Sequence, residues 1–495
     1  MLSHHLPILQ VVVPLIGALL CALLRRGTPA WALSLVVSWI MPGIAITLLL
    51  QVQEGGPVSY HLGGWAPPWG IEYRVDLLSA FILVLITTIG AAIMPFARRS
   101  VAHEIDGDKQ AWFYTMYLLC LTGLVGITVT GDAFNIFVFL EISSLSTYVL
   151  IAMGKDRRAL LAAYQYLIVG TIGATFYVIG IGLLYLVTGS LNIVDIAARL
   201  GPAAAETSRP VLAALAFLTV GVSLKLALFP LHVWLPGAYA HGPSVATAFL
   251  AGTATKVAVY VLLRLIFSVF GVAVSFRTLP VSEVLLGLSV AAMFIASILA
   301  VFESDVKRVL AYSSLGQIGY ITLGIGLANV PGLTGGIVHL FNHALMKTAL
   351  FMSLGALVYR IGTIKLAELA GIGRTMPLTM AVFVVGGLAL IGVPGTAGFV
   401  SKWYLAVGAF ERGWWPLAFL ILVTSLIAVV YVGRVVEVAW FREPTKFAAG
   451  ATDPPWSMLM PMLALAAATI YFGIDTEASA AIARGVAEAL IGGLR

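Results

Sequence analysis

The chain has 495 residues, of which 60% are hydrophobic and 10% charged, and its mean hydropathy is +1.02. These values exclude a soluble globular protein and indicate a polytopic, all-α membrane protein. The formal net charge of +6 does not indicate nucleic-acid binding, because the basic residues are scattered at the ends of apolar segments. Cys21 and Cys120 lie in apolar segments and show neither metal-ligand spacing nor a disulfide framework.

About fourteen apolar segments are long enough to cross a bilayer, at roughly 20 residues for each span. In chain order they cover 6–24, 30–51, 75–97, 111–131, 133–153, 160–188, 211–235, 243–270, 281–302, 308–328, 332–359, 377–410, 414–440 and 456–474. The loop 53–74, which contains GGWAPPWG, is expected to form a small cap on one face. The segment 475–495 is Ala-rich and amphipathic.

Basic residues gather after the odd-numbered spans. The clusters are Arg25/Arg26, Arg98/Arg99, Lys155/Arg157/Arg158, Lys307/Arg308, Arg360/Lys365/Arg374 and Arg442/Lys446. The opposite loops carry few basic residues, and these are mixed with acids. By the positive-inside rule, both termini are expected to face outward. The loop between spans 7 and 8 adds no information, because it holds His232 and His241 but no lysine or arginine.

Two spans are expected to be broken helices. The segment 377–410 would run about 50 Å as one helix, against a hydrocarbon core of about 30 Å, and it contains Gly392-Val-Pro-Gly395. The segment 211–236 contains Pro230 shortly after Lys225. The two interruptions fall at corresponding places in two five-span blocks, spans 4–8 and 9–13. Paired broken helices in repeat-related positions are typical of ion sites in transporters.

The chain is accordingly divided into four parts. The parts are 1–110, with the first three spans; 111–275, with the first five-span block; 276–441, with the second block; and 442–495, with the last span and the amphipathic segment.

Five charged residues lie inside otherwise apolar spans: Glu141, Lys225, Lys256, Lys347 and Lys402. A cation near the bilayer centre costs roughly 2.5–3.5 kcal/mol on insertion scales. A chain that keeps these groups is expected to use them as stations for protons or cations.

Glu141 lies at mid-span and is followed by hydroxyl residues. Burial favours its protonated form and a nearby lysine favours its ionised form, which is the balance that a proton-loading site requires. Lys225, next to a helix break, can likewise take up and release a proton as its acid partner approaches or withdraws. The structural alternatives are an acid that pins two helices through a hydroxyl, and a lysine that snorkels to an interface.

Lys256 lies about thirteen residues into its span, too deep to snorkel easily, and is expected to face a wet interior lined by Thr253 and Thr255. Arg264, two turns on, is nearer the end of the span and is interpreted as structural. Lys402 follows the second break and suits an exit or entry station, with snorkelling as its alternative.

His339, His343 and Lys347 recur at i, i+4 and i+8 and form one stripe of a helix. Histidine titrates near neutrality, so this stripe suits proton hopping through side chains and water. A lone interior histidine is more often a satisfied hydrogen-bonding group. The stripe is not a zinc motif of the HExxH type, and no metal site is expected.

Other polar and aromatic residues are interpreted as structural. The acids at span edges are expected to be solvated: Asp132, Asp195, Glu303 and Asp305. The tryptophan-rich positions are interpreted as an interfacial belt: Trp65, Trp69, Trp414 and Trp415.

Five ordered motifs carry a resemblance that covers roughly residues 75–440. They are FVFLEISSLSTYVLIA, SLKLALFPLHVWLPGAYAHGPSVATAFLAGTATKVAVY, KRVLAYSSLGQIGY, HLFNHALMKTALF and GVPGTAGFVSKW. The chain resembles the antiporter-like subunits shared by respiratory complex I, membrane-bound hydrogenases and Mrp-type monovalent cation/proton antiporters. Within that family it looks most like the D-subunit branch of the Mrp antiporters.

The resemblance implies a fold of about fourteen transmembrane helices with inverted five-helix repeats, each holding one broken helix. The family's buried glutamate falls on Glu141, its partner lysine on Lys225, its central lysine on Lys256 and its terminal lysine on Lys402. The family's histidine-bearing helix falls on His339 and His343. The chain departs from the family at Gly395, where a second proline often follows the first. It also lacks the long lateral C-terminal helix of the largest members.

These features predict a proton-translocating subunit of a multisubunit Na⁺/H⁺ antiporter in the bacterial inner membrane, with other subunits of that complex as its partners. The alternative is a proton-pumping membrane-arm subunit of a complex I-like or energy-converting hydrogenase complex. A weaker possibility pairs the chain with a soluble partner in inorganic-carbon uptake. No segment could bind iron–sulfur clusters, flavin or quinone by itself, so we expect no cofactor and a transporter subunit, not a redox enzyme.

Overall fold

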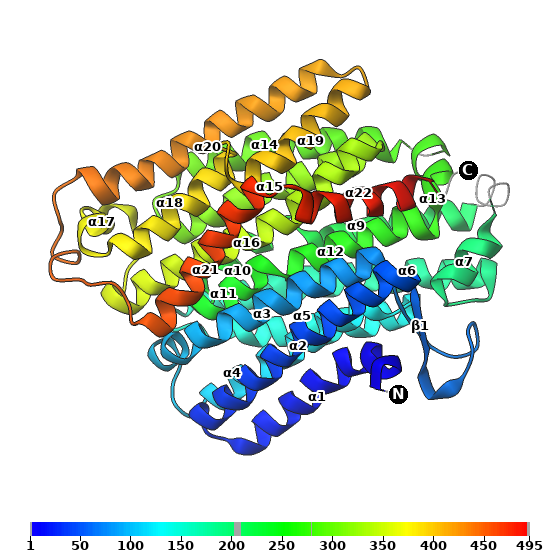
Figure 1. Ribbon diagram of the computed structural model, residues 1–495, viewed down its shortest axis with the longest axis horizontal. Coiled ribbons are helices and arrows are strands. Elements are labelled where there is room, and N and C mark those ends of the chain that lie inside the picture. Colours follow the sequence, from blue (N-terminus) through cyan, green and yellow to red (C-terminus); the bar gives the residue numbers. More distant parts are fainter. Residues whose placement is uncertain (1, 202–208, 279, 493–495) are drawn as a thin grey trace.

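The computed structural model describes residues 2–201, 209–278 and 280–492. Figure 1 shows long helices lying roughly side by side, with α1 along one edge and α20 along the opposite edge. The N-terminal part contains a 3₁₀ turn (Leu2–His5), α1 (Leu6–Leu24), α2 (Gly27–Gly55), β1 (Val58–His61), a 3₁₀ turn (Leu62–Gly64), β2 (Glu72–Val75) and α3 (Leu77–Glu104).

The first five-span block contains α4 (Gln110–Val129), α5 (Ala133–Ala152), α6 (Arg158–Thr188), α7 (Ile193–Leu200), α9 (Arg209–Leu226), α10 (Trp234–His241), α11 (Ser244–Gly252) and α12 (Ala254–Leu263). A π-helical turn (Arg264–Val269), α13 (Gly271–Ala273) and a second π-helical turn (Val274–Thr278) follow.

The second block and the C-terminal part complete the chain. They contain α14 (Val281–Phe302), α15 (Val306–Leu327), α16 (Val330–Ile361), a 3₁₀ turn (Leu366–Leu369), α17 (Ile372–Thr375), α18 (Pro377–Ile391), α19 (Ala397–Glu411), α20 (Trp415–Phe441), α21 (Trp456–Ile474) and α22 (Glu477–Gly492).

The number of predicted spans is confirmed. Twelve helical segments of the described chain are long and apolar enough to cross a membrane. The remaining two spans are α15, which is more polar, and the pair α18/α19, whose halves of 15 residues each are too short singly. Because each block has five spans, an odd number, the second block enters the membrane from the opposite side and is inverted relative to the first.

Both predicted helix breaks are present. The α9 helix ends at Leu226 and α10 begins at Trp234, so residues 227–233 interrupt span 7. The α18 helix ends at Ile391, and Gly392 follows with φ 87°. That φ favours glycine, and a Cβ at Gly392 would also lie 2.9 Å from the Cδ atom of Lys402.

The end of span 7 was predicted too early. The α10 helix continues to His241, so His232 lies in the interruption and not in the loop between spans 7 and 8. A third break was not predicted: α11 ends at Gly252 and α12 begins at Ala254, with Thr253 between them at φ −127°, ψ −57°. Such a break leaves the last carbonyls of α11 without helical partners.

The predicted cap at 53–74 is a β-hairpin in which β1 and β2 pair antiparallel. The backbone N–H of Gly131 donates to the carbonyl of Glu72 at 2.8 Å, which attaches the hairpin to the start of α5. The Glu72 carboxylate accepts a hydrogen bond from the Asn192 side chain at 2.8 Å. The hairpin therefore holds together the end of α4 and the starts of α5 and α7.

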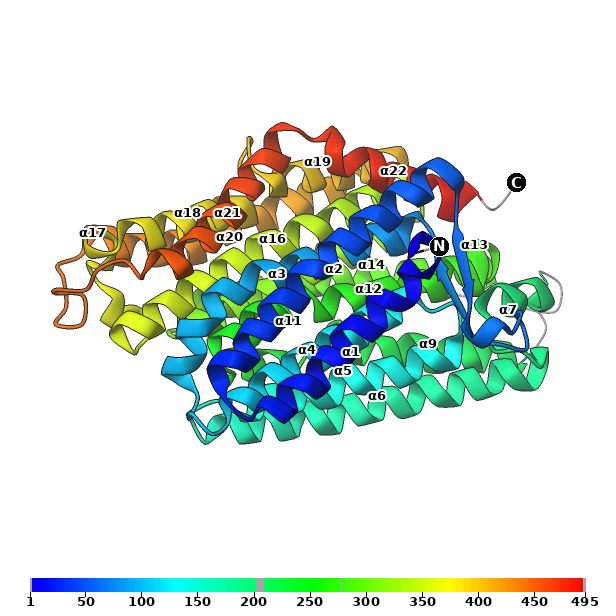
Figure 2. The ribbon, with the colours of Figure 1, turned by 60° about the horizontal axis from the view of Figure 1, so that its bottom comes forward.

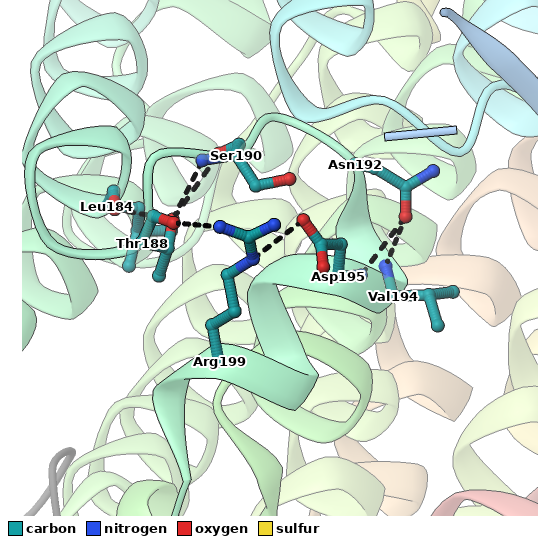
Figure 3. A network of polar contacts seen from close by, with 7 residues as sticks. All are labelled: Leu184, Thr188, Ser190, Asn192, Val194, Asp195 and Arg199. Atoms are coloured by element: carbon teal, nitrogen blue, oxygen red, sulfur yellow. Dashed lines mark hydrogen bonds and ion pairs between the residues drawn. The ribbon is translucent and has the colours of Figure 1, made fainter. Parts of the chain in front are cut away.

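The loop between α6 and α7 is fixed by the polar network in Figure 3. The Arg199 guanidinium pairs with Asp195 at 2.9 Å and donates to the Thr188 carbonyl at 3.0 Å. Asn192 accepts hydrogen bonds from the backbone N–H groups of Val194 and Asp195, both at 3.1 Å. These contacts fix Asn192, whose backbone forms an antiparallel β-bridge with that of Asp132 just before α5.

The expectation that Asp132 is solvated was wrong. Asp132 is buried and its carboxylate accepts a hydrogen bond from the backbone N–H of Asn135 at 2.7 Å, as the N-cap of α5. Asp305 caps α15 in the same way, at 3.1 Å from the Arg308 N–H. The amphipathic segment is α22, which crosses the bundle over α16 and α3 (Figure 1).

Candidate functional site

Glu141 and Lys225 face each other between α5 and α9. The Lys225 Nζ atom lies 3.5 Å from Glu141 Oε1 and donates to the Ser144 hydroxyl at 2.6 Å. Lys225 is buried, whereas the Glu141 side chain keeps 28% of its exposure. Lys225 stands in the last turn of α9, just before the break, where the negative end of the helix dipole favours a cation. The sequence prediction of a carboxylate–lysine pair at this break matches the observed geometry.

Lys256 is buried at the third break. Its ammonium group donates to the Ala251 carbonyl, one of those released where α11 ends, and lies 3.4 Å from the Thr255 hydroxyl. Thr253 is also buried, but its hydroxyl donates to the Phe249 carbonyl at 2.7 Å and not to Lys256. Lys256 is therefore held chiefly by backbone dipoles.

His339 and His343 occupy the middle of α16, and both are buried. The rings are parallel, with centroids 6.0 Å apart. His339 Nδ1 shares a hydrogen bond with the Ser401 hydroxyl at 2.7 Å, which links α16 to α19. Within the described chain His339 Nε2 and both ring nitrogens of His343 have no protein partner.

Buried nitrogen atoms of this kind are normally satisfied by water. This part of α16 therefore suits proton transfer through water.

Lys347, one step further along the stripe, is completely buried. Its ammonium group donates to the Leu310 carbonyl at 2.8 Å and to the Ser313 hydroxyl, both on α15. It thus faces α15, whereas His339 faces α19.

Lys402 follows the break between α18 and α19. Its Nζ atom donates to the carbonyls of Leu390 and Ile391, each at 2.9 Å, and to the Ser425 hydroxyl at 2.8 Å. The two carbonyls belong to the last turn of α18, where helix ends leave such groups free. The ammonium also lies 4.7 Å from the centre of the Tyr320 ring. Lys402 is buried, so snorkelling is not its role.

The central groups follow one another through the protein. His339 lies within electrostatic range of Lys256 and Lys402, and His343 within range of Lys256 and Lys347. Of the four lysines predicted inside spans, Lys225 alone forms an ion pair within the described residues.

Ser144, Ser313, Ser401 and Ser425 were not singled out as lysine or histidine partners. For Ser144, Ser313 and Ser401, the only sequence signal of such a role was their position in the same motifs as the charged residues. For Ser425 the sequence contained no signal.

Arg264 is buried among side chains that join two helices. It pairs with Asp76, the N-cap of α3, and donates to the Ser79 hydroxyl at 2.8 Å and to the Tyr260 hydroxyl at 3.1 Å. These contacts fasten α12 to α3 near the hairpin.

The sequence profile of the "NADH:quinone oxidoreductase/Mrp antiporter, TM" family matches residues 130–428. NADH-quinone oxidoreductase subunit N of Desulforudis audaxviator is 40% identical over 492 residues, which cover 96% of this chain and 97% of that protein. The D subunit of the Na(+)/H(+) antiporter of Alkalihalophilus pseudofirmus is 29% identical over 477 residues, covering 96% and 94%.

Among solved structures, a chain of the Mrp complex from Dietzia sp. DQ12-45-1b superimposes with a TM-score of 0.91 at 27% identity, over 100% of this chain and 98% of that one. The likeness therefore extends over both five-span blocks, as the motifs predicted. The chain is a multi-pass membrane protein that belongs to the NADH:quinone oxidoreductase/Mrp antiporter transmembrane family.

Proposed function

We propose that this chain is the proton-translocating subunit of a multisubunit monovalent cation/proton antiporter in a bacterial inner membrane, with Na⁺ as the exchanged cation. The observation that carries the proposal is a set of ionisable groups inside the spans: the half-buried Glu141, which pairs with Lys225, and the buried Lys256, His339 and Lys402. Each ionisable group inside a membrane costs several kcal/mol, so a protein that keeps such groups is expected to use them in transport.

The switching step is assigned to Glu141 and Lys225. When the pair is closed, each charge stabilises the other and Lys225 retains its proton. When Glu141 takes up a proton, Lys225 loses its counter-charge and releases its proton toward Lys256. His339 and His343 then relay protons between Lys256 and Lys402 through water. The charge state of Lys347 changes the electrostatic potential at His343.

The exposure of Glu141 supports a partner subunit. The exposed face of α5 carries Phe134 at 43%, Val138 at 39%, Leu145 at 54% and Val149 at 39% exposure. Glu141, at 28%, lies on the same stripe of the helix. A carboxylate that met lipid tails at this depth would be costly, whereas a neighbouring subunit can cover the stripe and supply polar partners.

The second candidate is a membrane-arm subunit of a redox-driven proton pump. It is favoured by the relative of 40% identity, which is named as a subunit of NADH-quinone oxidoreductase. The same ionisable groups would carry protons in either complex. In a redox-driven pump, the reaction that supplies the energy would take place in other subunits.

The test is to purify the native complex by a tag on this chain, identify its subunits, and follow internal pH in everted vesicles. The antiporter proposal expects small membrane subunits, and proton movement when Na⁺ is added. Redox subunits, with proton movement only on addition of an electron donor, would establish the second candidate instead. A chain that purifies alone from the native membrane would contradict both.

A further inference from the structure

A groove of about 670 Å³ lies between α2, α3 and the start of α4, and its lining includes no residue of the charged series. Its lining combines aromatic, aliphatic and basic side chains with the first residues of two helices. The residues are Gly27, Thr28, Trp31, Leu35, Trp39, Pro95, Arg98, Arg99, Ala102, Gln110, Tyr114 and Ser457. Figure 2 shows α2 and α3 as neighbouring long helices on the outer surface of the bundle.

The wall of the groove is built around Pro95 inside α3. Proline has no backbone N–H, so the carbonyl of Ala91, four residues earlier, loses its helical donor. The indole N–H of Trp39 donates to that carbonyl at 3.1 Å, and the indole N–H of Trp31 donates to the Met94 carbonyl at 2.9 Å. The two hydrogen bonds therefore fix the positions of both indole rings along the groove. At roughly 1.5 Å per residue, the two tryptophan positions on α2 are about 12 Å apart.

The mouth of the groove is cationic. Arg98 and Arg99 are exposed and form no ion pair in the described part of the chain. The Arg98 guanidinium lies over the Trp31 ring at 4.9 Å, which orients it at the mouth. Gly27, Thr28 and Gln110 stand in the first turns of α2 and α4, and neither helix has a side-chain cap. Unsatisfied N–H groups at these helix starts add to the attraction for an anion.

We propose that this groove binds one anionic phospholipid. Its phosphate would lie between Arg98, Arg99 and the Thr28 hydroxyl, and one acyl chain would run along Leu35 and Trp39. Charge complementarity selects this occupant, because the groove joins an unpaired cationic mouth to an apolar, aromatic channel that descends into the bilayer. The mouth also lies on the face where the basic clusters gather, which is where anionic headgroups attract arginine and lysine.

The binding can be measured on the purified complex in bilayers of phosphatidylcholine with increasing phosphatidylglycerol that carries brominated chains. Bromine quenches the fluorescence of a tryptophan in contact with the chain. The signal from the groove is the difference between the wild type and a Trp31→Phe/Trp39→Phe variant. At about fivefold for each arginine, phosphatidylglycerol should be preferred over phosphatidylcholine by about 25-fold.

Arg98→Gln/Arg99→Gln should abolish this preference, whereas Arg98→Lys/Arg99→Lys should keep most of it. A matched control is Arg157→Gln/Lys446→Gln, which removes two exposed basic residues from loops of the same face, outside the groove, and should leave the preference unchanged.

Four results would overturn the proposal. Equal quenching by brominated phosphatidylcholine would indicate the ordinary lipid annulus. Relief of quenching by inorganic phosphate would indicate a site for the free anion. Absence of quenching by either lipid would indicate that a neighbouring subunit fills the groove. Loss of preference in the control variant would indicate a general effect of surface charge.

Discussion

Replacing Glu141 by glutamine tests the switching pair most directly. The amide keeps the size and hydrogen-bonding capacity of the side chain but can neither hold a charge nor take up a proton. The atoms of the pair are 3.5 Å apart, which corresponds to an attraction of about 5 kcal/mol at an effective dielectric constant of about 20. If about half of this is offset by desolvation, a loss of roughly 2.5 kcal/mol remains, or about 60-fold.

The matched comparison is Ser144→Ala, which removes the other partner of Lys225, a neutral acceptor at 2.6 Å. The donor is a charged ammonium, and such hydrogen bonds contribute about 1.5–3 kcal/mol. The lower value applies here because Glu141 still balances the charge of Lys225, so transport should fall by about 10-fold. Glu141→Gln should therefore be the more severe change. Assembly should survive in both variants. Without Glu141, Lys225 can release its proton and avoid a buried, unpaired charge, and without Ser144 the Glu141 carboxylate still balances that charge.

The assay is proton movement in everted vesicles, followed with a pH-sensitive dye and started by Na⁺ or by an electron donor. Native gels of the same membranes measure assembly. Wild-type rates in Glu141→Gln would remove Glu141 from the mechanism. An equal loss in Ser144→Ala would mean that the geometry around Lys225 matters and the negative charge does not.

Three further predictions address the rest of the chain. Lys256→Ala should stop transport because no other cation among the described residues lies at the third break, whereas Arg264→Lys should be mild since lysine can keep the ion pair; normal salt-resistant growth of the alanine variant would contradict a continuous series. His4→Cys and Asp475→Cys, in a background without native cysteines, should react with an impermeant thiol reagent in whole cells, and Arg157→Cys only after permeabilisation; the reverse pattern would invert the topology. The purified chain in liposomes with an imposed Na⁺ gradient should move no protons, because its buried groups make one path and coupling needs a second ion site; robust Na⁺-dependent proton movement would refute dependence on partners.

The spans and two of the three helix breaks could be predicted from the sequence. Bilayer thickness fixes span length, and Gly392 with Pro394, or Pro230 near Lys225, interrupts a helix through missing N–H groups and free backbone rotation. The break at Thr253 could not be predicted in the same way. A single glycine such as Gly252 is common within transmembrane helices and is a weak signal.

The charged members of the site could be predicted, but their neutral partners could not. A lysine in an apolar segment is conspicuous because its burial is costly. A serine in such a segment is not conspicuous, because its hydroxyl can donate to a carbonyl of its own helix. Ser425 donates in this way to the Ile421 carbonyl at 3.0 Å. Only the three-dimensional structure brings Ser425 to Lys402 and Ser401 to His339.

The burial of Asp132 and the position of His232 were mispredicted for a related reason. An acid at the edge of a span is compatible with solvent or with a helix cap, and the sequence alone favoured solvent. The cap itself is a local contact with Asn135, but Asp132 also pairs through its backbone with Asn192 of the α6–α7 loop, and that contact joins residues 60 positions apart. Likewise, α10 continues after the break because it packs against α6 and α15, which local sequence does not show.

The helix breaks and the lysines have one physical connection. Lys256 and Lys402 each place their ammonium on carbonyls that a broken helix leaves free, and Lys225 stands at the end of α9. Carbonyl dipoles stabilise a cation without neutralising it, so a proton on either of these lysines can still be displaced by a second positive charge nearby. A full carboxylate at every lysine would hold its proton too firmly for transfer. A single carboxylate at one end, Glu141, is therefore enough to set the charge state of the series, and this is why the largest effect of any conservative substitution is expected there.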